Sequence, residues 1–463
     1  MSKKRVESIT DGTVVLYEKK QSRRAGKAFV LQLGEHFSID ASHIANYCFS
    51  DKGELIDDIA AVLSGARTAD RAFIRRHGKA WGRHLTVELP VFKLDLWKSH
   101  EVQISLIDAL QYLTGDQWKF SFQQRTQKAE SFTQEHVVAM PLREHVFMPY
   151  SSGLDSYAQA REIEKNGSGP ELVMINVQPS RRLPKWDRLG HPSRGDVKSV
   201  PVAACFHEPH HTEPSFRTRP FVYDLIAAYG ATMAAPAHVV IPENGQGSLG
   251  GSLVPLGAEA PHRSCHPGFT IRLSNLVKAL TGTRVEFSHP AIFLTKGQVL
   301  KKLSENNPET SVWLDEHRSC SYDARHSSTG KFRMHCGVCG NCILRRVSLL
   351  WAGIEDTTSY RASNISSKTF ENIFSNTIPK EIKAYKDVAM NGIRAMQRLA
   401  DLAAQPESPR ISAEAAGLAR YLQQPNQEVR SKMHTFLEQH RLEWDTFLSG
   451  CGKDSWVARL VRA

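Results

Sequence analysis

The sequence predicts an α/β protein whose central part is a parallel β-sheet built from βαβ units. Between residues 143 and 355, short apolar segments alternate with helical segments, as they do in parallel sheets. The residues before this part mix both kinds of pattern, and those after it are helical in character. We therefore expect an N-terminal α+β domain at 1–142, the parallel-sheet domain at 143–355 and a helical region at 356–463.

The composition is that of an ordinary globular protein with a basic charge balance. The 463 residues are 41% hydrophobic and 23% charged, which excludes collagen-like, largely disordered and coiled-coil chains. Since no apolar run of about 18 residues occurs and none follows the basic start, we expect a cytoplasmic protein without membrane contact. The formal net charge of +11 suits a nucleotide, a nucleic acid or an acidic protein, but a solvated basic surface is the simpler explanation.

The N-terminal region shows local patterns of both kinds and no chemical motif. Apolar and polar residues alternate as in strands at 13–17, 28–33, 84–92 and 118–122. Residues 55–63 have apolar positions at helical spacing. These patterns predict the α+β domain and leave its role open.

The central and C-terminal regions differ in periodicity. Central strands are expected at 146–150, 172–177, 201–204 and 239–242, with helices at 156–165 and 220–233. The C-terminal region should contain helices at 380–404, 412–423 and 427–448, with a break at 405–409. Parallel sheets bind their ligands beyond the carboxyl ends of the strands, so the turns after the central strands are candidate sites.

A turn of small polar residues joins the first central strand to its helix. It consists of Ser151, Ser152, Gly153, Leu154, Asp155 and Ser156. Small residues let backbone amides approach an anion, and the first helical turn adds free N–H groups. The serine hydroxyls can bond phosphate oxygens, whereas Asp155 is better suited to hold Mg²⁺ or to orient the turn. The alternative is an ordinary polar turn in which a serine caps the helix.

Four cysteines form the second signal. They are Cys320, Cys336, Cys339 and Cys342, with the spacing C-x15-C-x2-C-x2-C. Four thiolates can close a tetrahedral site around Zn²⁺, and the intervening glycines let the chain turn between ligands. A closed site has no open coordination position, so its role would be structural. The alternative is four reduced thiols without a metal.

Together these features resemble one enzyme family. The polar turn resembles the SGGxDS pyrophosphate loop (PP-loop) of the ATP pyrophosphatases, with Ser152 in place of the pattern's first glycine. A PP-loop near the start of an α/β domain that ends in a four-cysteine knuckle resembles the QueC family, the 7-cyano-7-deazaguanine synthases. Further matches follow in chain order, at Asn176, at Arg217 and Arg219, and at Arg345. The resemblance covers about residues 143–353.

The segment that corresponds to the family's substrate-binding residues departs from the family pattern. Residues 243–269 occupy the place of the family's substrate-binding segment and keep only its general layout. A GxGxxG pattern at 245–250 is followed by Pro255 and Pro261 instead of a helix, which predicts a flexible substrate loop including Glu243, Asn244 and Gly245. Enlarged QueC-like proteins of this kind occur in bacterial antiphage systems, notably the Qat system and type IV CBASS. The chain most resembles that group.

The resemblance implies an ATP-dependent, adenylate-forming enzyme that uses ATP, Mg²⁺ and a structural Zn²⁺. The carboxylate of a 7-deazaguanine-type molecule would attack the α-phosphorus of ATP, and residues 151–156 with Asn176 would hold the pyrophosphate. An amine would then displace AMP. The amine is ammonia in the family, and in the antiphage group it would be the N-terminus of a partner protein encoded in the same operon.

The resemblance also implies catalytic roles for charged residues. These residues are Asp155, Arg217, Arg219 and Lys296. Any of the three cations could bind the α-phosphate or the substrate carboxylate, and a surface cation is the alternative for each. The protein would act by positioning and charge stabilisation.

Two other functions stay open. A PP-loop enzyme that modifies tRNA would suit the net charge of +11. A catalytically inactive, nucleotide-binding subunit of a defence complex would suit the departure at Ser152. In each case the flanking regions are candidate partner-binding surfaces, although a plain internal core explains the apolar positions of the helical tail as well.

Overall fold

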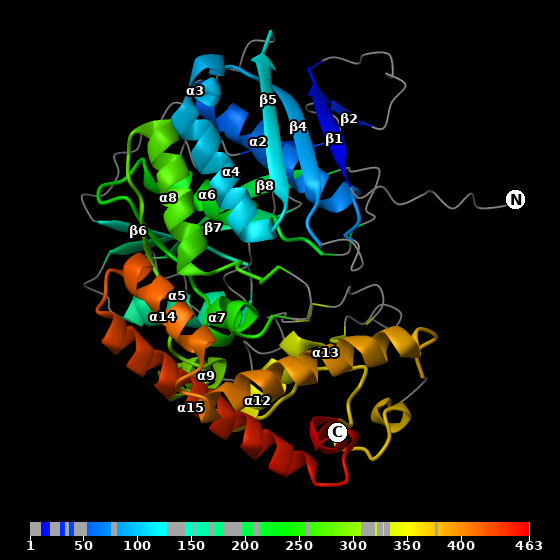
Figure 1. The fold of residues 1–463 in the computed structure, drawn as a ribbon. Helices are drawn as coiled ribbons and strands as arrows, with labels where there is room; N and C mark the ends of the chain where they lie inside the picture. The colour runs from blue at the N-terminus through cyan, green and yellow to red at the C-terminus, as the bar shows by residue number, and fades with distance from the viewer. Residues whose placement is uncertain are drawn as a thin grey trace, which may run out of the picture.

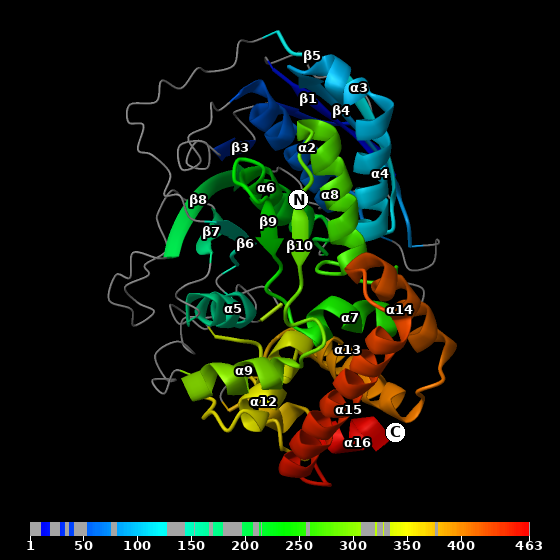
Figure 2. The same ribbon diagram turned by 90° about the vertical axis from the view of Figure 1, so that its left-hand side faces the viewer.

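The chain is arranged in three tiers. The computed structural model describes residues 11–18, 28–32, 37–40, 53–75, 81–126, 144–151, 153–165, 170–178, 197–206, 213, 215–255, 260–306, 320–321, 327, 334–375 and 378–462. Figure 1 shows an N-terminal sheet with its helices, then a central sheet, then a group of C-terminal helices. The perpendicular view gives the same order (Figure 2). Among the helices described, none is both long and apolar enough to cross a membrane.

The N-terminal tier is a four-stranded sheet in the order β2-β1-β4-β5, and its strands all pair in parallel. Its elements are β1 (Gly12–Tyr17), β2 (Phe29–Gln32), α2 (Gly53–Ala72), β4 (His84–Val91), α3 (Leu94–Lys98), α4 (His100–Thr114) and β5 (Gln117–Gln124). The expected strands and helix are present. The expected α+β arrangement is wrong for this tier, because its neighbouring strands pair in parallel, with α2 before β4 and α3 and α4 before β5.

The central tier is a six-stranded sheet in the order β10-β9-β6-β7-β8-β3. Its strands are β3 (Phe37–Asp40), β6 (His145–Pro149), β7 (Glu171–Gln178), β8 (Val197–Phe206), β9 (His238–Val240) and β10 (Glu286–Ser288). All are parallel except β3, which lies antiparallel beside β8. From β6 the sheet grows through β7 and β8 on one side and through β9 and β10 on the other. The order therefore reverses between β6 and β9, and sheets of this kind bind ligands at such a reversal.

Helices cover the central sheet and form the third tier. The central helices are α5 (Leu154–Lys165), α6 (Arg219–Ala231), α7 (Gly245–Leu253), α8 (Pro267–Thr281) and α9 (Lys296–Asn306). The C-terminal helices are α12 (Gly340–Trp351), η2 (Glu371–Ile373), α13 (Ile382–Asp401), η3 (Leu402–Ala404), α14 (Pro409–Leu422), α15 (Asn426–Cys451) and α16 (Trp456–Arg462). The three helices expected after residue 380 are confirmed as α13, α14 and α15, and the break before Pro409 separates the first two.

The N-terminal and central tiers share one hydrophobic core. It includes Val87 of β4, Leu106 of α4, Phe147 of β6 and Phe269 of α8, all fully buried. Helices α4 and α8 lie side by side in both views (Figures 1 and 2). Burial of apolar surface on both sides of this contact therefore fixes the N-terminal tier against the central one.

A cluster of buried charges reinforces this joint. Asp70, Arg75, Arg83 and Asp116 are each exposed by 5% or less. Arg83 Nη2 lies 2.7 Å from Asp70 and 2.8 Å from Asp116, and Arg75 Nη2 lies 2.6 Å from Asp116. The backbone N–H of Thr218, just before α6, donates to Asp70 at 2.9 Å. Burial acts to raise the pKa of Asp70, but the charges of Arg83 and Arg75 outweigh it and lower that pKa.

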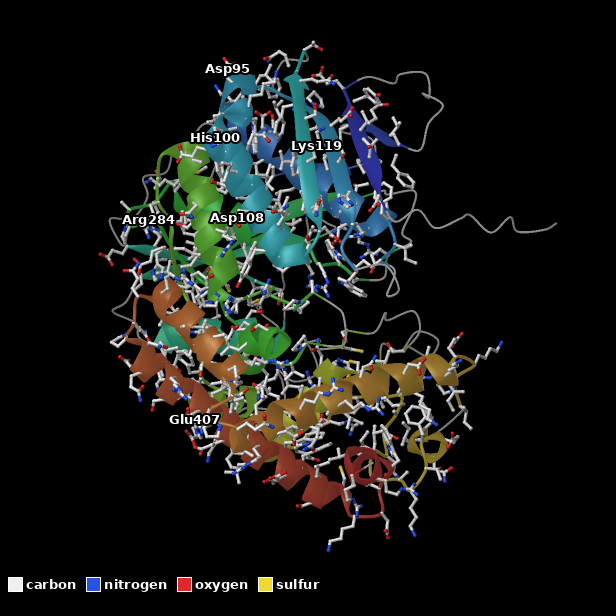
Figure 3. The ribbon with its side chains drawn as sticks, in the orientation of Figure 1. Asp95, His100, Asp108, Lys119, Arg284 and Glu407 are labelled. Carbon is white, nitrogen blue, oxygen red and sulfur yellow. The ribbon has the colours of Figure 1, made fainter. Side chains whose placement is uncertain are left out.

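Removing one of these charges leaves its partners buried without compensation. We expect Arg83→Met to lower the free energy of unfolding by about 3–5 kcal/mol, measured by urea denaturation. Lys119, labelled in Figure 3, is exposed on β5 and provides the control. Lys119→Met should change the same quantity by less than about 0.5 kcal/mol. An Arg83→Met protein as stable as the wild type would show that the cluster does not hold the tiers together.

Candidate functional site

The turns after β6 and β9 meet at the reversal of the central sheet. β6 leads through Tyr150 and Ser151 towards α5, and the Tyr150 N–H extends the sheet by donating to Ile175 O at 2.8 Å. β9 leads through residues 241–244 into α7. In Figure 2, helices α5, α7 and α9 lie together at the end of the sheet that faces the C-terminal tier. Ser152 lies outside the described residues.

Asp155, in the first turn of α5, is held from two other elements. Asn244 Nδ2 donates to its Oδ1 at 2.8 Å, and Lys296 Nζ forms an ion pair with its Oδ2. The side chain of Lys296 is 5% exposed and that of Asp155 is 19% exposed, so water screens this pair only weakly. We call Asp155, Asn244 and Lys296 the Asp155 cluster. These three candidates, far apart in the sequence, therefore form one site.

Asn244 is placed by its role as the cap of α7. Its Oδ1 accepts from the N–H of Gly247 at 3.1 Å, as an N-cap side chain does. The expectation of a flexible loop is wrong from Gly245 onwards, because Gly245–Leu253 is a helix that ends before Pro255. Its glycines are poor helix formers, but Leu249 and Leu253 are fully buried against the C-terminal helices. Tertiary packing thus outweighs local propensity here.

Lys296 is placed by a capping box at the start of α9. The Thr295 N–H donates to Gln298 Oε1 at 3.0 Å, and the Gln298 N–H donates to Thr295 Oγ1 at 3.1 Å. The backbone N–H of Lys296 donates to Gln246 Oε1 at 2.9 Å. Our sequence reasoning missed Thr295 and Gln246. The T-x-x-Q pattern could have revealed the cap, whereas no local pattern points to Gln246.

Glu243 adds a second carboxyl group beside the Asp155 cluster. Its Oε1 accepts from Asn244 Nδ2 at 2.8 Å. Desolvation and the charge of Asp155 raise the pKa of Glu243 to about 8, although Lys296 opposes this. Carboxylate oxygens are the hard ligands that Mg²⁺ prefers, so Glu243 would join Asp155 as a ligand only after losing this proton.

The remaining loop candidates lie at the same edge of the sheet. Ser151 Oγ and Ser156 Oγ are 3.0 Å apart, and Ser156 Oγ donates to Gly153 O at 3.3 Å. Leu154 is buried against α9 and α12 and anchors the turn. Asn176 is buried on β7, one residue beyond Ile175, whose carbonyl accepts the Tyr150 N–H. The polar turn and this end of β7 are therefore neighbours.

The two candidate arginines make other contacts. Arg217 Nη1 donates to Ala260 O at 2.7 Å, and its guanidinium lies 5.3 Å from the centre of the Trp81 ring. Arg219 is exposed, and its guanidinium lies 5.3 Å from the centre of the Tyr223 ring. The hydrogen bonds and ion pair that define the Asp155 cluster do not include either arginine.

The four candidate cysteines come together as a possible metal site. The sulfur atoms of Cys320, Cys336, Cys339 and Cys342 all lie within 4.8 Å of one another. The sulfurs of Cys320 and Cys339 are 4.0 Å apart, and those of Cys336 and Cys342 are 3.8 Å apart. Ligands about 2.3 Å from a tetrahedral Zn²⁺ lie about 3.8 Å from one another, so the set fits zinc. Hydrogen bonds from neighbouring thiols, Cys320 first, lower the pKa of Cys339.

The knuckle packs tightly on the C-terminal helices. Gly337 has φ +85°, a conformation that favours glycine. A Cβ on Gly392 of α13 would lie 2.7 Å from the backbone nitrogen of Gly340, so the two backbones touch. The cysteines also share a core with Tyr385 and Trp444. Any metal bound here therefore supports the C-terminal tier.

A separate groove of about 1140 Å³ lies between β10, α8 and the α14–α15 turn. Phe287, Phe293 and Tyr421 are among its lining residues. No member of the Asp155 cluster lines it, so this groove and the cluster are different features of the surface.

The knuckle predicts a specific metal content. We expect about one equivalent of zinc per chain by elemental analysis. Cys339→Ser should lose the metal and lower the melting temperature, because the cysteines form a metal site only in the folded chain. Cys265→Ser alters a cysteine outside the set and should keep the zinc. Full stability after complete removal of metal by a chelator would contradict this assignment.

The raised pKa of Glu243 predicts a pH dependence of stability. Between the ordinary value of 4.5 and about 8, the folded chain keeps a proton that the unfolded chain has released. Stability from this group is therefore full at low pH and is lost as the pH rises through that window. In Glu243→Gln the loss is absent, so the melting temperature should fall less between pH 5 and pH 9 than in the wild type. An equal fall in both proteins would contradict the raised pKa.

Comparison with known proteins assigns no family to the chain. No protein-family model matches it, and a search of curated proteins finds no match either.

Proposed function

We propose that the chain is an ATP-dependent, adenylate-forming enzyme of the QueC-like PP-loop type. The supporting observation is the Asp155 cluster, which joins the first turn of α5 to α7 and α9 at the reversal of the central sheet. The sequence resemblance adds the reaction class. The proposed substrate is the carboxylate of a 7-deazaguanine-type molecule.

In this proposal ATP lies along the carboxyl edge of the sheet. Its β- and γ-phosphates meet the start of α5, where the free backbone N–H groups and the hydroxyls of Ser151 and Ser156 can bond them. Bound Mg²⁺ supplies positive charge that neutralises the phosphates, and Asp155 and Glu243 are the residues that would hold it. Lys296, which pairs with Asp155 in the structure, would turn to a phosphate oxygen of bound ATP.

The reaction proceeds in two displacements. An oxygen of the substrate carboxylate attacks the α-phosphorus, the bond to the bridging oxygen of the β-phosphate breaks, and pyrophosphate leaves. An amine then attacks the acyl carbon, loses a proton and displaces AMP, which forms an amide. The chain's residues contribute orientation and charge stabilisation at both steps. For the second step we propose the N-terminus of a partner protein as acceptor, in antiphage defence.

Identification of the nucleotide product tests this proposal. The protein is incubated with ATP, Mg²⁺ and 7-carboxy-7-deazaguanine, with and without co-purified partners, and AMP is separated from ADP by chromatography. We expect AMP and pyrophosphate, with turnover lowered at least about 100-fold in Asp155→Ala and Lys296→Met because each removes a preorganised charge. Lys301→Met alters an exposed lysine of the same helix and should leave turnover unchanged.

The other outcomes separate the alternatives. Formation of ADP would show that the phosphate turn is misinterpreted. Binding of ATP without turnover under all conditions would favour an inactive nucleotide-binding subunit, which the serine at position 152 makes a distinct candidate. Salt-sensitive retention of RNA together with AMP formation would favour a tRNA-modifying enzyme, as the charge of +11 would suit.

A further inference from the structure

Helix α15 reaches from the C-terminal tier to the back of the Asp155 cluster. Glu443 of α15 is 1% exposed, and its Oε1 accepts hydrogen bonds from Thr295 Oγ1 and, at 3.0 Å, from Gln439 Nε2. Thr295 is the cap residue directly before Lys296. A buried carboxyl group of the C-terminal tier thus holds Thr295, the residue that caps α9.

A second hydrogen-bonded path reaches Lys296 from the same helix. His440 Nε2 donates to Met396 O at 3.0 Å, so its Nδ1 is left to accept from Gln246 Nε2 at 3.4 Å. Gln246 Oε1 in turn accepts the Lys296 N–H. Burial lowers the pKa of His440 to about 4, which keeps the ring neutral as both bonds require. The path runs from α13 through α15 and α7 to α9.

If the contact between α15 and α9 served packing alone, its buried glutamate would lower stability without benefit. Within the described residues, Glu443 Oε2 is buried without a hydrogen-bond partner. A Cβ on Gly297 would lie 2.6 Å from that oxygen, so the carboxyl group lies directly against the first turn of α9. A buried polar atom without a partner costs stability, and an apolar side chain would pack α15 at lower cost. The need to position the neighbouring Asp155 cluster therefore explains a glutamate at position 443 better than packing does.

We propose that Glu443 and His440 are positioning residues that fix the first turn of α9 and thereby keep Lys296 Nζ on Asp155. They act through Thr295 and Gln246, and neither belongs to the Asp155 cluster itself. The C-terminal tier thus completes the site within the same chain. The catalytic consequence rests on the proposed function, whereas the placement of Lys296 does not.

The placement is tested by the reactivity of Lys296 in the full-length protein. Acetylation by an amine-reactive reagent is followed by mass spectrometry, with exposed Lys301 of the same helix as internal reference. We expect Glu443→Leu to raise the acetylation rate of Lys296, and the amide hydrogen exchange of 296–300, about tenfold relative to Lys301, because the turn opens more often. Glu443→Gln keeps an acceptor for Thr295 and should remain close to the wild type. Glu438→Leu, at an exposed position of α15, is the matched control.

A folded Glu443→Leu protein whose Lys296 is as protected as in the wild type would overturn the proposal. If Glu443→Leu does not fold, the smaller change Glu443→Ala is compared with Glu443→Gln, since only glutamine keeps an acceptor for the Thr295 hydroxyl and both variants leave the cap of α9 intact. Equal protection of Lys296 in these two variants would also overturn it. Where ATP turnover is measurable, Glu443→Leu should lower kcat more than it raises KM for ATP. If the wild type neither binds nor cleaves ATP, the proposed function fails while the reactivity of Lys296 still decides this inference.

Discussion

The orientation of the N-terminal tier on the central sheet is constrained by four buried charges that must satisfy one another. Asp70, Arg75, Arg83 and Asp116 are withdrawn from water, and their mutual attraction offsets the desolvation only if α2, β4, β5 and the turn before α6 meet in one arrangement. Because Asp70 also accepts the N–H of Thr218, that arrangement includes the start of α6. α6 packs on β6, β7 and β9. The charge cluster thus constrains the orientation of the sheet that carries the site.

The candidate site is held from the opposite side by the C-terminal tier. Asp155 lies in the first turn of α5, while Asn244 approaches it from the start of α7, which packs on α13 and α14, and Lys296 from α9, which packs on α12. The cysteine knuckle supports this tier through the contact between Gly340 and Gly392. The site therefore lies between two scaffolds of different kinds, one based on buried charge and the other on a possible metal centre.

Local patterns predicted much of the secondary structure but little of the site's geometry. The cysteine spacing identified a set of sulfurs that the structure brings together, because all its ligands but Cys320 lie within seven residues. Strand β3 was missed since its four residues are stabilised by pairing with distant β8. The patterns listed Lys296 and Asp155 as separate candidates. Their contact depends on Gln246 and Glu443, whose partners are remote in sequence.

The distance along the chain between Lys296 and Glu443 has a consequence for protein synthesis. About 150 residues separate them, which a ribosome adds in about 7–30 s at about 5–20 residues per second. The two sheets and α9 leave the ribosome well before α15 is made. During that interval Thr295 and Gln246 lack their final partners, and apolar faces of α7 are uncovered. A nascent chain therefore reaches its working geometry only when translation is almost finished, and premature termination before α15 releases an unfinished site.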